Sequence, residues 1–194
     1  MLGRADLSRA ARRAVAGRVI ETERLVLREP VTGDRDALVA MLTNQEVMAQ
    51  LFPGMDETAA DAVIAKHDRM RHERLGFLVA ERRDDGTVVG FCGLKRGEPH
   101  APIDGKIEAG WIIDLPWWRH GYAREAMEAV FAQAWGQIAE DRIYAITSAV
   151  NLKSQALMAR LGMARLVDGD YLSATFPEGH ELRPTVTFAI DRPA

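Results

Sequence analysis

The stretch that decides the fold is 117–126, which reads Trp-Trp-Arg-His-Gly-Tyr-Ala-Arg-Glu-Ala. Apolar residues then recur at steps of three and four, as they do on the buried face of an α-helix. These apolar residues are Ala126, Met127, Val130, Phe131, Ala134, Trp135 and Ile138. The residues before Ala126 therefore form the beginning of a long amphipathic helix.

This helix start is suited to binding an anion. The first N–H groups of a helix have no acceptor within it and lie at the positive end of its dipole. Gly121 lets the main chain approach a ligand closely, and Ala123 leaves room for it. Arg119, His120 and Arg124 add positive or potentially positive charge. The stretch matches neither the P-loop nor the dinucleotide-binding pattern, so a nucleoside triphosphate or a dinucleotide is not the leading ligand.

Composition indicates one ordinary domain with no membrane or nucleic-acid partner. The chain has 194 residues, 47% of them hydrophobic, and can bury a sizeable core. Its formal net charge of −3 gives no bulk attraction to nucleic acid or anionic lipid. No stretch approaches the run of about 18 apolar residues that spans a membrane. The single cysteine, Cys92, excludes an internal disulfide and favours a reducing, cytoplasmic location, and it reads as a small buried filler.

The N-terminus differs in composition from the rest of the chain. Arginines stand among alanines in residues 1–19, without the continuous apolar segment of a secretory signal. We interpret 1–19 as an arginine-rich N-terminal extension that forms a solvated helix, in preference to an organelle transit peptide. Residues 20–194 then form the domain itself.

The remaining pattern predicts a mixed sheet with helices on its faces. Strands are predicted at 20–29, 77–82, 87–94, 106–114, 142–147, 163–174 and 185–190, and helices at 34–42, 58–73, 122–138 and 151–161. An Asp-Gly turn joins the second and third strands into a hairpin. The central helix connects 106–114 to 142–147 as a crossover, so these two strands should pair parallel.

The strand at 106–114 leads directly into the helix start. Glu108, Gly110 and Ile112 share one of its faces. A glycine inside a strand often marks a bulge or the close approach of a ligand. We therefore expect a ligand to lie where this strand ends.

Other polar residues receive no functional role from the sequence. His67 and His72 are five residues apart, so they do not share a helix face as a metal pair would, and we interpret both as surface histidines. No metal site is expected. His180 is expected to be exposed, and Tyr144 and Tyr171 are interpreted as core or rim residues.

In this order the segments resemble the GNAT N-acetyltransferase superfamily. The resemblance is carried by Trp117 to Ala123 at the start of the central helix and by the Asn-Leu-Lys-Ser segment 151–154. Residues 22–28, 108–112 and 151–163 are similar to the branch that contains the ribosomal-protein N-terminal (alanine) acetyltransferases. The family pattern at the turn is Gln or Arg, two residues, Gly, one residue, then Gly or Ala. Trp118 departs from its first position, where a bulky residue is usual in this branch.

The resemblance implies both a fold and a cosubstrate. The fold is α/β (α+β), the GNAT acyl-CoA N-acyltransferase fold, with a mixed, mostly antiparallel sheet of six to seven strands splayed at a bulge. The anion would be the pyrophosphate of acetyl-CoA, whose pantetheine arm would lie between strands 106–114 and 142–147. A backbone N–H near Ile112 or Ile113 would stabilise the oxyanion. The implied cofactor contacts are Ile112, Ile113, Trp118, Arg119, His120, Gly121, Tyr122, Ala123, Arg124 and Asn151.

Acetyl transfer also needs a proton acceptor and is helped by a proton donor. A lysine amine has a pKa of about 10.4 and an α-amine about 7.7 to 8.0, yet the attacking nitrogen must be neutral. Glu108 is the candidate base, and its alternative role is a solvated or ion-paired carboxylate. Ser154 stands where this branch resembles enzymes with a serine acid, although it could equally satisfy a free backbone N–H. Asn151 could contact the pantetheine amides, act as an ordinary N-cap, or do both.

The prediction is an acetyl-CoA-dependent N-acetyltransferase that acetylates a primary amine by direct attack in a ternary complex. A protein N-terminus is preferred as acceptor over an aminoglycoside or a polyamine, and a homodimer is an open expectation. Three alternatives remain: transfer of a different acyl group, a non-catalytic CoA-binding sensor, and an RNA-associated protein that uses the arginine-rich leader. Trp117 and Trp118 would stack on bases only beside a basic groove, so packing beside the cofactor is preferred.

Overall fold

The computed structural model describes residues 17–193, so residues 1–16 of the predicted extension lie outside the described part. The strands are β1 (Val19–Glu21), β2 (Leu25–Arg28), β3 (Gly76–Arg82), β4 (Val88–Arg96), β5 (Ile107–Ile113), β6 (Arg142–Ser148), β7 (Ala164–Arg165), β8 (Tyr171–Leu172) and β9 (Pro184–Asp191). The helices are α2 (Arg35–Thr43), α3 (Gln45–Met48), α4 (Glu57–Arg69), α5 (Tyr122–Ala134) and α6 (Leu152–Arg160). Short 3₁₀ turns stand at Thr32–Asp34, Arg71–Glu73, Leu115–Trp117 and Val167–Gly169.

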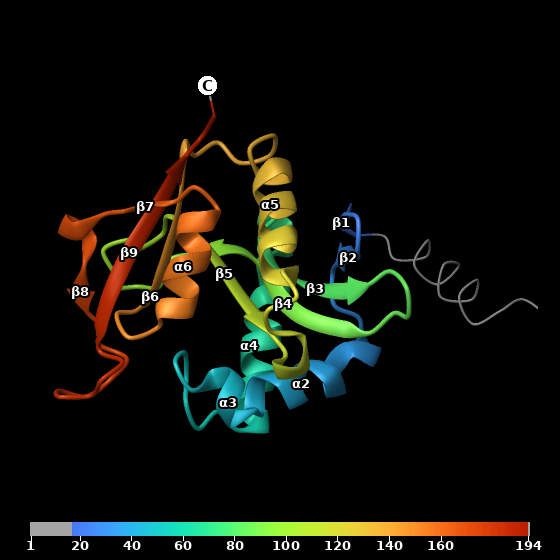
Figure 1. Cartoon of the computed structure of the whole chain (residues 1–194), viewed down its shortest axis with the longest axis horizontal. Helices are drawn as coiled ribbons and strands as arrows, with labels where there is room; N and C mark the ends of the chain where they lie inside the picture. The colour runs from blue at the N-terminus through green and yellow to red at the C-terminus, as the bar shows by residue number, and fades with distance from the viewer. Residues whose placement is uncertain (1–16, 194) are drawn as a thin grey trace, which may run out of the picture.

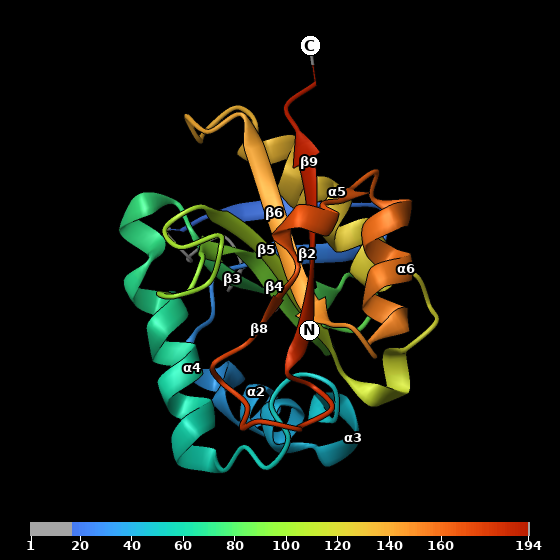
Figure 2. The ribbon, with the colours of Figure 1, turned by 90° about the vertical axis from the view of Figure 1, so that its left-hand side faces the viewer.

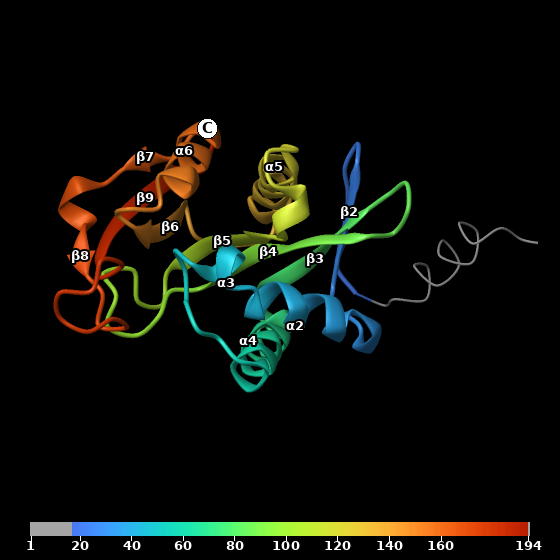
Figure 3. The same ribbon diagram turned by 60° about the horizontal axis from the view of Figure 1, so that its bottom comes forward.

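The strands form one mixed sheet with helices on both faces (Figure 1). Its order is β1-β2-β3-β4-β5-β6-β9-β7, and β8 pairs with β9. All neighbours pair antiparallel except β5 and β6, which run parallel as predicted for a crossover through α5. α5 and α6 cover one face, and α2 and α4 cover the other (Figure 3). The predicted fold class is confirmed.

The described sheet has nine strands where six to seven were predicted, because two predicted strands are each divided. The predicted strand 20–29 is a hairpin, in which β1 and β2 pair antiparallel and Thr22 N–H donates to the Leu25 carbonyl. The predicted strand 163–174 is β7 and β8, which both pair with β9. The alternation of apolar and polar residues continues through a tight turn, so the sequence pattern does not show where one strand ends and the next begins.

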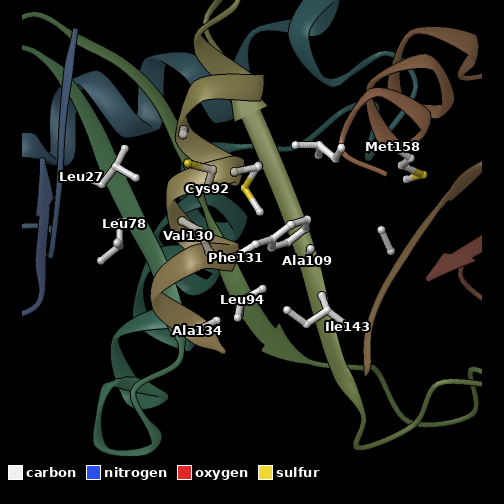
Figure 4. Packing of buried hydrophobic residues seen from close by; sticks show 14 of the residues in the cluster. Leu27, Leu78, Cys92, Leu94, Ala109, Val130, Phe131, Ala134, Ile143 and Met158 are labelled. Carbon is white, nitrogen blue, oxygen red and sulfur yellow. The ribbon is translucent and has the colours of Figure 1, made fainter. Parts of the chain in front are cut away.

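Two apolar layers hold the helices to the sheet. On the α5 face, Val130 and Phe131 pack toward β4 residues such as Cys92 and Leu94 (Figure 4). On the α2 and α4 face, a second cluster contains Phe77 and other buried residues of β3 and β4. Cys92 is fully buried, and burial raises the pKa of its thiol to about 12. Its interpretation as a buried filler is confirmed.

Two helix predictions need correction. The helix α5 ends at Ala134 and not at Ile138, because the chain turns there and both Gln137 and Ile138 donate to the Ala134 carbonyl. α4 ends at Arg69 and not at 73.

The interpretation of His67 as a surface residue was wrong, because this side chain is 5% exposed. Ala60, Val63, Ile64 and His67 recur at helical spacing and face the sheet together. The imidazole stacks on Phe77, with ring centroids 3.9 Å apart. Burial lowers the pKa of His67 to about 3, helped by the charges of Lys95 and Lys66. His67 is therefore a neutral residue of the interior.

Glycine in β5 serves packing. The register of β5 against β4 runs without a shift from Ile107 to Ile113, so the predicted bulge does not appear on that side. A Cβ on Gly110 would lie 2.5 Å from Cζ of Phe77. Gly110 thus makes room for the ring that supports His67.

Candidate active site

β5 and β6 separate beyond a single residue pair. Within residues 17–193 they pair only at Glu108 and Tyr144, whereas β5 pairs with β4 from Ile107 to Ile113. The edge of β5 that faces β6 is therefore without a strand partner after Glu108. This separation matches the splay that the family resemblance implies.

The hydrogen-bond pattern shows which amides of β5 face this gap. The Asp114 N–H donates to the Val89 carbonyl of β4 at 2.9 Å. Successive residues of a strand direct their N–H and C=O groups to opposite edges. The Ile112 amide therefore also faces β4, while the amides of Trp111 and Ile113 face the gap. Only Ile113, of the two predicted oxyanion donors, has its N–H on the correct side.

A cavity of about 630 Å³ lies at the gap. Glu108 and Ile112 line it from β5 on the face that α4 covers, while Ser154 and Met158 line it from α6 on the opposite face. The cavity therefore passes through the sheet between β5 and β6. The two side chains predicted to act as base and acid are brought to one cavity from opposite faces.

Glu108 is buried beside a lysine that the sequence did not indicate. It is 5% exposed, and the Lys95 ammonium lies 2.7 Å from its carboxylate. Burial raises the pKa of Glu108, although the charge of Lys95 opposes the shift. Burial alone would lower the pKa of Lys95, but Glu108 and Glu98 outweigh it and the pKa is raised. Glu108 is thus ion-paired, as its alternative role predicts, and it also lines the cavity, as a catalytic base would.

Ser154 and Asn151 are linked at the start of α6. The Ser154 N–H donates to Asn151 Oδ1 at 3.2 Å, so Asn151 is the N-cap of α6. Asn151 is buried, and Ser154 is half-buried with its hydroxyl in the cavity lining. No described residue forms a hydrogen bond with that hydroxyl, which leaves it available to a ligand.

The turn before α5 presents its main chain to solvent. Arg119 and Gly121 have φ values of 64° and 83°, and both are exposed together with His120. No side chain caps the helix, and the first helical bond runs from Glu125 N–H to the Gly121 carbonyl at 3.1 Å. The amides that precede this bond are those of Tyr122, Ala123 and Arg124. The anion-binding geometry predicted from the sequence is therefore available at this turn.

The β1–β2 hairpin holds the same turn in place. Thr22 Oγ1 and the Arg24 backbone N–H both donate to Glu125 Oε1, at 2.6 and 2.8 Å. The Arg24 guanidinium donates to the Glu125 carboxylate and to the His120 carbonyl. The sequence assigned the segment 22–28 to a strand and to the family resemblance, and the structure gives Thr22 and Arg24 a specific contact with α5.

Trp118 contacts both β5 and α6, which lie on either side of the gap. Its indole N–H donates to the Ile113 carbonyl at 2.7 Å, and the Lys153 ammonium of α6 lies 4.2 Å from its ring centroid. Trp117 packs against the core, with the Arg82 guanidinium 4.5 Å above its ring. Neither ring is placed as an open platform for nucleic-acid bases.

Tyr171, interpreted as a core or rim residue, lies at the cavity, whereas His180 lies outside its lining and was predicted with the wrong exposure. Tyr171 lines the cavity, and burial raises its pKa to about 12, with a further contribution from Glu108. His180 is half-buried and stacks on Phe176, with centroids 4.9 Å apart, whereas exposure was predicted. These contacts depend on the return of the chain after β8, which no local pattern encodes.

The described residues offer neither a metal cluster nor a membrane-spanning helix. Within residues 17–193, no cluster of three or more His, Cys, Asp or Glu side chains could hold a metal ion. Among the helices in this range, none has the length and apolar character needed to cross a membrane.

Comparison with known proteins places the fold in a wider group. The family model described as acetyltransferase (GNAT) domain matches residues 24–164. The uncharacterized N-acetyltransferase YoaA of Bacillus subtilis is 27% identical over 154 residues, which cover 76% of this chain and 83% of YoaA.

Two solved structures share the fold at low sequence identity. Spermidine N-acetyltransferase from Vibrio cholerae, in complex with CoA and spermine, has a TM-score of 0.68 at 18% identity, covering 88% of this chain and 97% of that one. The ribosomal-protein α-N-acetyltransferase RimL, in complex with coenzyme A, has a TM-score of 0.70 at 16% identity, covering 90% and 98%. At these identities the two structures support the fold alone.

Proposed function

The chain belongs to the acetyltransferase (GNAT) domain family, and on that premise we propose that it transfers the acetyl group of acetyl-CoA to a primary amine. The observation that carries this proposal is the cavity through the sheet at the β5–β6 gap. A thioester held on the face of α5 and α6 would meet, in that gap, an amine held on the face of α4. Attack is direct, because Cys92 is fully buried and cannot carry the acetyl group.

The turn before α5 fits the pyrophosphate of acetyl-CoA. Its exposed amides lie at the positive end of a thirteen-residue helix, where an anion is stabilised. We assign the contact to the predicted residues Trp118, Arg119, His120, Gly121, Tyr122, Ala123 and Arg124. The amides supply most of the binding, while Trp118 holds the turn through Ile113 and the arginines add charge.

The pantetheine and acetyl groups are assigned to the gap. The free edge of β5 offers the Trp111 and Ile113 backbone groups, and the Ile113 N–H donates to the acetyl oxygen as negative charge develops there. Ile112 contributes its side chain to the cavity wall. Asn151 caps α6 through Oδ1 and contacts the pantetheine arm with its amide group.

Glu108 and Ser154 complete the proton balance. Glu108 takes the first proton from the ammonium and passes it to solvent, which leaves a neutral amine, and it then takes the second proton, which the nitrogen loses after attack. The raised pKa of a buried carboxylate makes Glu108 a stronger base. The amine nitrogen forms a bond to the acetyl carbon, and the carbon–sulfur bond breaks. Ser154 donates a proton to the departing sulfur and regains one from solvent.

The test is thiol release from acetyl-CoA across peptides, polyamines, aminoglycosides and simple amines, with product masses to locate the acetyl group. Direct attack predicts initial-velocity lines that intersect when both substrates are varied, and a double-displacement enzyme would give parallel lines. Binding of acetyl-CoA without CoA release from any amine would overturn the proposal and favour the sensor alternative.

A further inference from the structure

The acceptor end of the cavity has apolar walls built from distant segments. The loop after α3 and the loop between β8 and β9 lie side by side there (Figure 2), and Phe52 stacks on Phe176 with ring centroids 6.4 Å apart. The apolar lining at this end includes Leu51, Phe52, Met55, Val63, Phe176 and Leu182. A ligand group that enters from this side meets hydrocarbon before it reaches Glu108.

The lysines and glutamates that line the cavity already form one neutral row. Lys66 pairs with Glu98, Glu98 pairs with Lys95 at 3.1 Å, and Lys95 pairs with Glu108 at 2.7 Å. The two positive charges therefore balance the two negative charges. His67, which also lines the cavity, stays uncharged because burial lowers its pKa to about 3. This row has no surplus carboxylate, so the reacting nitrogen attacks as a neutral amine and any further cationic group lacks a free counter-ion.

We propose that the acceptor is a primary amine whose reacting nitrogen is its one basic group, carried on an apolar alkyl or aryl body. This inference rests on the proposed acetyl transfer and narrows its acceptor. A second ammonium would lie near Phe52, Met55 and Val63, which are exposed or half-buried, so it would lose part of its hydration without gaining a free carboxylate. Glu98 already lies between two ammonium groups, those of Lys66 and Lys95, so it has no net charge to spare for a third. An apolar body gains from the same walls by leaving water.

The test compares two amines of equal length that differ by one terminal nitrogen. Hexylamine should be acetylated with a kcat/KM about tenfold or more above that of hexamethylenediamine, as expected for a polar group in an apolar pocket. A second comparison uses a peptide with N-terminal Leu and a peptide with N-terminal Lys. Acetylation of the Leu peptide would identify a protein N-terminus as the acceptor, and acetylation of hexylamine alone would identify a small-molecule amine. Equal or better use of the diamine and of the Lys peptide would overturn the inference.

A pair of variants sharpens the test. Met55→Glu adds an unpaired carboxylate to the apolar end, so it should raise kcat/KM for the diamine and lower it for hexylamine, about tenfold in their ratio. Val167→Glu places the same charge on a residue that is 70% exposed and outside this cavity, and it should leave the ratio unchanged. If Met55→Glu leaves the ratio unchanged, the apolar end does not select the acceptor. If kcat/KM is higher for the diamine than for hexylamine, this inference alone is contradicted. If no amine causes CoA release, both the proposed function and this inference are contradicted.

Discussion

The two faces of the sheet contribute to the cavity in different ways. The groups assigned to acetyl-CoA in the gap and on the face of α5 and α6 come mainly from the continuous stretch 113–124, and most are backbone amides. On the face of α4, the groups assigned to the acceptor are side chains from α4, β4, β5 and the loops that follow α3 and β8. A site made from one stretch can be predicted from its motif, whereas a site assembled from separate segments needs the fold.

Replacing Glu108, the proposed base, should have the largest effect on kcat and almost none on acetyl-CoA binding. Glu108→Gln keeps the shape but cannot accept the amine proton, so kcat should fall about 10²- to 10⁴-fold. The affinity for acetyl-CoA should hardly change, because that contact lies on the other face. Steady-state kinetics and calorimetric binding of acetyl-CoA measure the two effects.

Glu98→Gln is the matched control, because it also removes a carboxylate bound to Lys95 but from a loop position that is half exposed. It should cost much less activity than Glu108→Gln. Equal losses from both variants would mean that Glu108 serves only to neutralise Lys95.

His67 should make the acceptor face sensitive to acid. Its pKa is about 3 in the folded chain and about 6.5 when unfolded, so below about pH 6.5 the unfolded chain binds a proton that the folded chain does not. As the pH decreases from about 6.5 to about 3, the free energy of unfolding should therefore fall by about 1.4 kcal/mol for each pH unit. Above about pH 6.5 this loss should be absent.

The control for this effect uses the second histidine of the same segment. Between about pH 7 and pH 5, the free energy of unfolding of His67→Phe should fall by about 2 kcal/mol less than that of the wild type, as measured by urea unfolding. His72→Phe, at a side chain that is 76% exposed, should keep the wild-type slope. The same slope in all three proteins would show that His67 titrates normally.

The outcome for His67 shows where sequence reasoning stops. The helix start at Gly121 was predictable, because turn, glycine and apolar period are all local. The faces of β5 were also predictable from alternation, which placed Glu108 and Ile112 together. Lys95 was not, because its contact with Glu108 depends on the register between β4 and β5. His67 was misread although it continues the stripe of Ala60, Val63 and Ile64, because histidine as a residue type is found both inside and at the surface.

A glycine in the left-handed backbone region tests the cofactor face alone. Gly121 has a φ of 83°, so Gly121→Val should destabilise the turn by about 1 to 2 kcal/mol and raise KM for acetyl-CoA about tenfold. Gly179→Val imposes the same backbone strain at a φ of 80° in the loop before β9. It should lower stability by a similar amount and leave KM for acetyl-CoA near the wild-type value. Similar KM values in the two variants would argue against pyrophosphate binding at the α5 turn.

Ser154 should have the smallest effect, because the leaving group needs little help. A thiol has a pKa of about 8.5, so a thiolate departs readily near neutral pH, and Ser154→Ala should lower kcat by less than about tenfold. Stability should be nearly unchanged, because the hydroxyl has no partner among the described residues while the N-cap bond uses the backbone N–H. Ser154→Cys retains a proton donor and should recover part of kcat. A loss of stability in Ser154→Ala with no change in kcat would instead assign Ser154 a structural role at the start of α6.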